Sequence, residues 1–271
     1  AELVFFIQNQ EEDHYQASKH SWGFRYLDRK VRNQGPLLVQ DIKDHFPDMK
    51  VLQMKAVKNG IRNSFRPEDI SQLQQLDLDF ILRFGFGILE GEILNVPRHG
   101  VWSFHHGDPR KFRGGPPGFW EIFQGEAVSG GILQRLNESL DAGIILKEGF
   151  LKTIAHSYRD NLYQLLEMSS IWPMQLAKSL QKHAQSLNTG AIETSAPIYK
   201  TPSSPQVIGF MVKLWINKWK FHYRDLFSAE KWNVGILDAP IDSLLENEVQ
   251  NIQWMPEVSS DSYLADPFPN L

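Results

Sequence analysis

The chain has 271 residues, 42% of them hydrophobic, and a net charge of −4 at pH 7, which is an ordinary globular composition with enough length for one sizeable core and an appended segment. The acidic balance argues against a polyanionic substrate such as tRNA, although a local basic face can coexist with an acidic total. Because the sequence has no cysteine and no long apolar run, it excludes disulfides, thiolate metal ligands and a transmembrane helix, and it fits a reducing, cytoplasmic location.

The first part of the chain alternates between predicted strands and helices. Residues 2–8 are strand-like, with a continuous apolar run at residues 3–7, which predicts a central parallel strand. Residues 11–33 are polar with scattered aromatics and favour a helix or loop, residues 37–45 have the spacing of a short helix, and residues 50–54 read as a strand. No glycine-rich phosphate loop occurs here, so we do not expect a dinucleotide cofactor such as NAD.

A helix and a strand then lead to a glycine-containing turn. Pro67, followed by two acidic residues, is typical of a helix start, and residues 78–84 read as a strand. Residues 84–89 follow with the sequence Phe-Gly-Phe-Gly-Ile-Leu, whose glycines allow the backbone to approach a flat ligand closely. The plain alternative is a strand-to-helix connection with two permissive glycines.

Polar side chains follow the next predicted strand, residues 101–104. His105, His106 and Asp108 come directly after it, where ligands collect in an open α/β sheet. These residues are therefore candidates for a site, although the histidines could equally satisfy the backbone of a turn. All three are also capable ligands of zinc or non-haem iron. Adjacent residues of an extended strand point to opposite faces, so both histidines could bind one metal only if the chain turned sharply at Gly107.

The rest of the chain is predicted to contain a strand pair and two helices. Residues 128–136 and 143–150 read as strands joined by an acidic loop, and residues 153–185 as a helix that breaks at Trp172-Pro173. Residues 187–205 have a linker composition, and residues 206–227 form a basic, aromatic helix. The tryptophans of that helix either pack on the main domain or contact a membrane surface or a partner. Short strands and turns are predicted for the tail.

Four motifs between residues 103 and 143 resemble, in order, those of the formyltransferase family, which includes methionyl-tRNA, glycinamide ribonucleotide and sugar N-formyltransferases. That family carries Asn-x-His, then Lys-Tyr-Arg-Gly in a Pro-rich loop, a helix, and Leu-Asp-x-Gly. The counterparts here are Ser103-Phe104-His105, Lys111-Phe112-Arg113-Gly114, residues 119–124 and Leu140-Asp141-Ala142-Gly143. Asp141 follows His105 by thirty-six residues, which is the family's interval. The sequence departs from the family at Ser103, which replaces asparagine, and at His106-Gly107-Asp108, which replaces Pro-Ser-Leu.

The resemblance implies an α/β fold with an open, mostly parallel sheet of the Rossmann-like formyltransferase type, and formyltetrahydrofolate as formyl donor. It implies catalytic roles for His105, Asp141 and Ser103. It also implies that the donor lies in a slot between two segments, which contribute Phe84, Gly85, Phe86, Gly87, Ile88 and Leu89 from one side and Arg135, Leu136, Asn137, Glu138 and Leu140 from the other.

The resemblance also implies a domain organisation. Residues 1–152 form the formyltransferase-like catalytic domain, from which the family's first β-α unit is expected to be missing. Residues 153–205 form a helix and linker, and residues 206–271 the basic, aromatic helix and tail. Residues 265–268, Ala-Asp-Pro-Phe, resemble the opening of a five-bladed β-propeller of glycan-acting enzymes. This resemblance implies a further domain beyond the C-terminus, and the alternative is a C-terminal extension that wraps the domain.

Formyl transfer makes two demands on a site. It needs a donor aimed at the developing oxyanion and an acceptor for the proton that the attacking amine loses. His105 can fill either role, and Asp141 beside it would orient the imidazole and favour its charged form. Ser103 offers one donor hydrogen on a shorter side chain than asparagine, and losing one oxyanion donor costs about 2.7–4 kcal/mol. Either a water or His106 replaces the amide, or activity is low or altered.

Three hypotheses remain for the acceptor. We favour the amine of an amino sugar, because the chain is acidic overall, no tRNA-binding barrel is recognisable in the tail, and the propeller-like pattern of residues 254–268 suggests an association with glycans. A methionyl-tRNA formyltransferase-like enzyme is the second hypothesis, and an inactive interaction module, suggested by Ser103, is the third. The residues that could bind sugar hydroxyls or a nucleotide diphosphate, or equally stabilise a loop, are His106, Asp108, Lys111 and Arg113.

Overall fold

The computed structural model describes residues 5–9, 21–33, 37, 42–138, 143–182, 194–227, 234–237 and 252–256. The chain divides into two compact units, residues 1–218 and 219–271, and each is described by itself. Within the described segments, no helix is long and apolar enough to cross a membrane.

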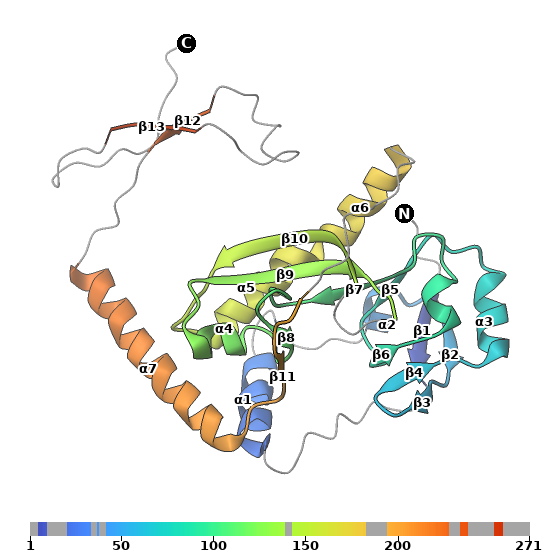
Figure 1. Cartoon of the computed structure of the whole chain (residues 1–271), viewed down its shortest axis with the longest axis horizontal. Helices are drawn as coiled ribbons and strands as arrows, with labels where there is room; N and C mark the ends of the chain where they lie inside the picture. Colours follow the sequence, from blue (N-terminus) through green and yellow to red (C-terminus); the bar gives the residue numbers. More distant parts are fainter. Residues whose placement is uncertain are drawn as a thin grey trace. The chain divides into compact units, whose positions relative to one another are not determined.

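A four-stranded sheet in the order β10-β9-β7-β5 lies at the centre of the first unit (Figure 1). Its strands are β5 (Ile81–Arg83), β7 (Val101–His105), β9 (Val128–Arg135) and β10 (Ile144–Lys152). β5 and β7 are parallel, whereas the pairs β7–β9 and β9–β10 are antiparallel. The sheet is therefore mixed, and the expectation of one mostly parallel sheet is not met in the described part of the chain. A short connection between β9 and β10 returns the chain antiparallel, because a parallel pair needs a long crossover.

Further strands form small sheets around this one. β1 (Phe5–Asn9) pairs parallel with β2 (Lys50–Met54), which confirms a parallel strand near the start of the chain, but among the described residues it has this one neighbour and is not central. Five strands that the sequence did not predict are β3 (Val57–Asn59), β4 (Arg62–Ser64), β6 (Ile88–Leu89), β8 (Arg113–Gly114) and β11 (Ile198–Tyr199). β4 joins β3 to β6, and β8 pairs with β11. Each is only two or three residues long, too short to show a hydrophobic period.

The helices largely follow the predicted pattern. α3 (Pro67–Gln74) begins at the proline, as predicted, and α4 (Phe119–Gln124) has the predicted bounds. α5 (Tyr158–Ser170) ends just before α6 (Trp172–Lys182), which confirms the break at Trp172-Pro173. The remaining helices are α1 (Trp22–Arg32), α2 (Ile42–His45), the short 3-10 helix η3 (Glu92–Asn95) and α7 (Ser204–Phe227).

An aromatic cluster packs four helices of the first unit together. The fully buried ring of Phe119 in α4 lies 5.8 Å from Phe24 of α1, 6.2 Å from Tyr158 of α5 and 4.1 Å from Phe210 of α7. The first turns of α7 therefore pack on the main domain. The buried aromatic of this contact is Phe210, whereas the tryptophans expected there, Trp215 and Trp219, are 62% and 64% exposed.

The two faces of the four-stranded sheet differ in what covers them. Trp102 and Leu133 point to the face that α5 and α6 cross, where they pack against Trp172 (Figure 1). Side chains alternate along a strand, so Ser103 and His105 point to the opposite face. That opposite face carries the candidate site.

In the second unit, two short strands are described, β12 (Gly235–Ile236) and β13 (Gln253–Trp254), and they pair antiparallel. They agree with the short strands predicted for the tail. The propeller-like residues 265–268 lie outside the described residues.

Truncating Phe119 tests the role of the aromatic cluster. Phe119→Ala is expected to lower the free energy of unfolding by about 3–5 kcal/mol, because it removes a fully buried ring and leaves a cavity among four helices. Tyr26→Ala on the exposed side of α1 is the matched control and should change stability by less than about 0.5 kcal/mol. Urea unfolding followed by circular dichroism measures both, and equal effects would contradict this account of the core.

Candidate active site

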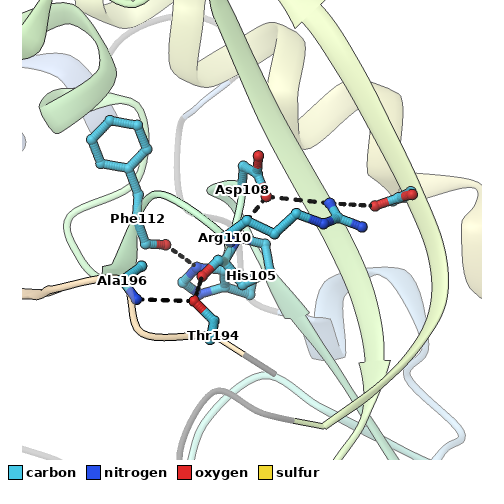
Figure 2. Close-up of polar contacts among 8 residues, drawn as sticks. His105, Asp108, Arg110, Phe112, Thr194 and Ala196 are labelled. Carbon is cyan, nitrogen blue, oxygen red and sulfur yellow. Dashed lines mark hydrogen bonds and ion pairs between the residues drawn. The ribbon is translucent and has the colours of Figure 1, made fainter. Parts of the chain in front are cut away.

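His105 ends β7, and its ring is held by the loop that follows. Nε2 lies 2.9 Å from the carbonyl oxygen of Phe112 (Figure 2). A carbonyl oxygen can only accept, so Nε2 carries the hydrogen, and in the neutral ring Nδ1 is the basic nitrogen. A Cβ at Gly107 would stand 3.2 Å from this Nε2 and 3.3 Å from the same oxygen. The absence of a side chain at Gly107 therefore lets the turn close around the hydrogen bond.

The loop of residues 108–112 is fixed by a charged network on the His105 face (Figure 2). Asp108 Oδ1 accepts from the Arg110 backbone N–H at 3.0 Å and from Arg110 Nη1 at 3.3 Å, and Nη1 also lies 2.9 Å from Glu148 Oε2 on β10. The Asp108 carbonyl accepts from the N–H of Phe112 at 2.7 Å. Asp108 and Arg110 thus set the position of the carbonyl that holds His105.

A distant segment supports the same loop. Thr194 Oγ1 donates to the Pro109 carbonyl at 2.8 Å and accepts from the Ala196 N–H at 3.1 Å (Figure 2). Lys111 Nζ lies 2.8 Å from Glu126 Oε2, and Arg113 lies in β8, paired with Ile198 of β11. These residues have structural contacts, and the substrate-binding roles expected for Asp108, Lys111 and Arg113 stay predictions.

His106 lies on the other side of the sheet from His105. Its Nε2 donates to Ser169 Oγ on α5 at 2.9 Å, since the Ser169 hydroxyl itself donates to the Leu166 carbonyl at 3.1 Å. The ring stacks on Phe104 at 5.7 Å. Burial lowers the pKa of His106 to about 4, helped by His105 and Arg32. His106 is therefore neutral at pH 7, and the structure does not bring it to the face on which Ser103 lies.

Ser103 is held by an arginine that the sequence did not single out. Its side chain is 1% exposed, and its Oγ accepts from Arg83 Nε at 3.1 Å and from Arg83 Nη2 at 2.9 Å. The parallel register of β5 and β7 sets these two residues side by side. The sequence did offer one indication of its role. Arg83 is a charged residue at the carboxyl end of an apolar run, and functional groups of α/β sheets collect at such strand ends.

The turn of residues 84–87 leads from β5 to β6 and forms one side of the predicted donor slot. Phe84 is 79% exposed, whereas Phe86 packs on Phe65 with ring centroids 5.3 Å apart. Phe86 and Gly87 have positive φ values of 63° and 58°. Asn63 Nδ2 donates to the Phe86 carbonyl at 2.7 Å, and a Cβ at Gly87 would stand 2.7 Å from that nitrogen. The turn therefore requires glycine at position 87.

The other predicted side of the slot begins where β9 ends, at Arg135. The Leu136 N–H donates to the Val101 carbonyl at 2.8 Å, and Leu136 packs in the same cluster as Phe86 and Leu89. Glu138 Oε1 accepts from the Gly91 N–H at 3.1 Å. The structure thus brings residues 135–138 next to the segment of residues 84–91. Leu140 and Asp141 lie outside the described residues, so the pairing of Asp141 with His105 stays a prediction.

The described segments contain no side-chain cluster that supports the alternative of a metal site. No group of three or more histidine, cysteine or acidic side chains there could hold a metal ion. The two adjacent histidines point to opposite faces of the sheet, where they bond to Phe112 and Ser169 respectively.

Among known protein families, one matches the part of the chain that contains this site. The formyl transferase family model matches residues 29–172, which include β5, β7, β9 and the loops between them. The chain belongs to the formyl transferase family. This family uses formyltetrahydrofolate as its formyl donor.

Individual formyl transferases match part of the chain. The methionyl-tRNA formyltransferase of Prochlorococcus marinus is 29% identical over 143 residues, which are 52% of this chain and 42% of the relative. The chain thus spans less than half of that relative's length. The methionyl-tRNA formyltransferase structure from Clostridium thermocellum has a TM-score of 0.40 at 15% identity, covering 75% of each chain. The sugar 3N-formyltransferase WlaRD has a TM-score of 0.40 at 13% identity, covering 79% of this chain and 69% of its own.

The buried His106 predicts a pH dependence of stability. The unfolded chain takes up a proton on this ring near pH 6.5, whereas the folded chain does so only near pH 4. The unfolded state therefore binds more protons in this window, and stability falls as the pH is lowered from 6.5 towards 4, by up to about 3 kcal/mol. His106→Gln keeps a hydrogen-bond donor for Ser169 and should lose this part of the dependence. Urea unfolding at several pH values compares the two proteins, and parallel curves would refute the assignment.

Proposed function

We propose that this formyl transferase moves a formyl group from formyltetrahydrofolate to the amine of an amino sugar, with residues 1–152 as the catalytic domain. The observation that carries the proposal is the position of His105 at the carboxyl end of β7, within the family match. Its Nε2 is occupied by the Phe112 carbonyl, so Nδ1 is the nitrogen that can take a proton. A histidine fixed in this tautomer is suited to general base catalysis.

In the proposed reaction the amine nitrogen attacks the formyl carbon, and a new C–N bond forms as the bond to the donor nitrogen breaks. Formyltetrahydrofolate supplies the activated formyl group. His105 Nδ1 takes the proton that the amine loses and returns it to the leaving nitrogen, so no net proton is consumed. Asp141, as predicted from the family motif, orients the imidazole and stabilises its charge. Such a base contributes typically 10²–10⁴-fold to the rate.

The residues of the two predicted slot segments suit a flat, partly apolar donor. The ring of Phe84, which lies 5.9 Å from that of Phe104, is largely exposed and offers a stacking surface, and a Cβ at Gly85 would meet nothing within 4 Å. Contacts between Glu138 and Gly91 hold the two segments close to each other. We therefore place the donor between residues 84–89 and residues 135–140.

The charge pattern near His105 favours an amino sugar over tRNA. Asp108, Arg110 and Glu148 place both signs of charge on this face, and the chain as a whole carries a net charge of −4. Mixed polar groups suit the hydroxyls of a sugar, whereas a polyanion is attracted by an excess of basic groups. The curated relative is named methionyl-tRNA formyltransferase, and this is why the tRNA acceptor stays the second candidate.

Ligand binding tests the donor. Folinic acid should bind and raise the melting temperature, because a ligand of the folded state stabilises it by mass action, whereas NAD should have no effect. Phe84→Ala should weaken the binding of folinic acid at least several-fold, since it removes the exposed ring from the slot. Tyr26→Ala, an exposed aromatic on α1, should not. Calorimetry that detected no folate binding would count against the donor.

A panel of acceptors tests the reaction. Nucleotide-linked amino sugars and aminoacylated tRNA are offered with formyltetrahydrofolate, and formylated product is measured by mass spectrometry. We expect the amino sugar to be formylated, and His105→Ala to lower kcat by about 10²–10⁴-fold. The matched control is His99→Ala, which alters a histidine outside the site.

Each outcome of the panel selects one hypothesis. Formylation of tRNA alone would replace the amino sugar as acceptor. Turnover that survived in His105→Ala would remove the role given to His105. Folate binding without any turnover would favour the inactive interaction module.

A further inference from the structure

Three polar side chains form a row across the sheet on the His105 face. The register of β5 and β7 sets Arg83 beside Ser103, and that of β7 and β9 sets Ser103 opposite Gln134. Directly opposed residues of neighbouring strands point to the same face, and so do residues two apart on one strand. His105 is therefore the next side chain on this face, about 6.6 Å further along β7.

Ser103 points to the face that carries the site, but Arg83 lies over its hydroxyl. Ser103 is 1% exposed, and its Oγ accepts two hydrogen bonds from Arg83, one from Nε and one from Nη2. The side chain of Arg83 is only half-buried. A ligand on this face would therefore meet the guanidinium before it could meet the hydroxyl.

The guanidinium is fixed at a second point. Arg83 Nη1 donates to the carbonyl of Gly87, in the turn that follows β5. That turn is itself tied down by the hydrogen bond from Asn63 to the Phe86 carbonyl. Two anchors on different segments hold the planar group in one orientation, so little reorganisation is needed when charge develops beside it.

We propose that Arg83 is the residue that stabilises the oxyanion in this enzyme, and that Ser103 is a positioning residue that holds its guanidinium in place. The proposal rests on the formyl transfer proposed above. As the amine attacks, negative charge grows on the formyl oxygen while His105 takes the proton. A fixed cation on the same face, one side-chain step from His105, stabilises that charge, and an arginine side chain is not deprotonated in proteins.

This arrangement differs chemically from an asparagine at position 103. An amide provides a neutral donor directly from β7, whereas here the charged donor comes from β5 and the β7 side chain is its acceptor. Hydrogen bonds from a charged group are stronger than those from a neutral one. Replacing asparagine by serine therefore need not lower the activity, because the shorter side chain leaves room for the arginine fork.

Steady-state kinetics test the two roles. Arg83→Gln should lower kcat by about 10²–10³-fold and change KM by no more than a few fold, since the lost contact acts on the developing charge. Ser103→Ala should lower kcat less, by about tenfold, because the guanidinium keeps its anchor at Gly87. Arg98→Gln removes an exposed arginine that pairs with Asp77 and Asp79, and it is the matched control.

Two further measurements separate catalysis from a structural effect. Added guanidinium chloride at millimolar concentration should restore part of the kcat of Arg83→Gln and none of that of His105→Ala. The double variant Arg83→Gln, Ser103→Asn supplies an amide from β7 and should be more active than Arg83→Gln alone. Circular dichroism melting curves check that Arg83→Gln folds. If Arg83→Gln does not fold, Arg83→Lys, which keeps the charge and loses the planar fork, is used in its place.

A binding measurement decides the inference without turnover. The probes are 10-formyl-5,8-dideazafolate, a stable donor analogue, and 5,8-dideazafolate, which lacks only the formyl group. The wild-type chain should prefer the formylated analogue by about tenfold, as a charge-assisted hydrogen bond to the formyl oxygen requires, and Arg83→Gln should lose this preference.

The outcomes distinguish this inference from the proposed function. If the wild type binds both analogues but formylates no acceptor, formyl transfer fails as the function, and the binding preference alone supports or overturns the role of Arg83. If the wild type turns over and Arg83→Gln keeps both kcat and the preference, the role of Arg83 is overturned and the function stands. If the wild type binds neither analogue, both are overturned.

Discussion

The parallel pairing of β5 with β7 is the constraint on which the rest of the site depends. Its register places Arg83 beside Ser103 and, through the alternation of side chains, leaves His105 on the same face. The same pairing aligns the turn of residues 84–87 with the end of β7. A slip of one residue would turn every side chain of β7 to the other face, so that His105 would point towards α5 and His106 towards the site. The buried Trp102 opposes that slip, because its side chain packs with Trp172 on the face that α5 and α6 cover and would lose this contact.

A second constraint holds the histidine itself. The Phe112 carbonyl that accepts from His105 belongs to a loop that Asp108 and Arg110 hold from within, and that Glu148 and Thr194 hold from two distant parts of the chain. Individual exposed ion pairs of this kind contribute little to stability. Together they fix one carbonyl oxygen, and through it the tautomer of one imidazole. Their effect is expected in the geometry of the site more than in the free energy of unfolding.

The sequence predicted those features that rest on local patterns. The proline at position 67 marked the start of α3, and the Trp172-Pro173 pair marked the break between α5 and α6, because proline acts on its own neighbours. The short pair β8 and β11 could not be predicted, since its two strands are only two residues long and lie far apart in the chain. The mixed order of the sheet also escaped prediction, because the family resemblance suggested parallel strands.

Site residues that belong to a sequence motif were predicted, whereas a residue that joins the site only through a contact in the fold was missed. His105 and Ser103 stood in the family motif, whereas Arg83 acquires its meaning only from the strand register that brings it to Ser103. We expected that a water or His106 would replace the missing amide, or that activity would be low or altered, and His106 was named because it is close to position 103 in the sequence. His106 is excluded from that role by alternation, which places it against Ser169 on the far side of the sheet.

The same contact weighs against the inactive interaction module. Holding a guanidinium half-buried against a buried hydroxyl costs desolvation energy. A guanidinium that stayed fully in water would not have this cost. An uncharged residue at position 83 could pack on Ser103 without that cost. The arginine is also held by the Gly87 carbonyl, whose turn requires glycine and two positive φ values. Such a cost, together with a constrained turn, is typical of a functional site and is not needed for packing alone.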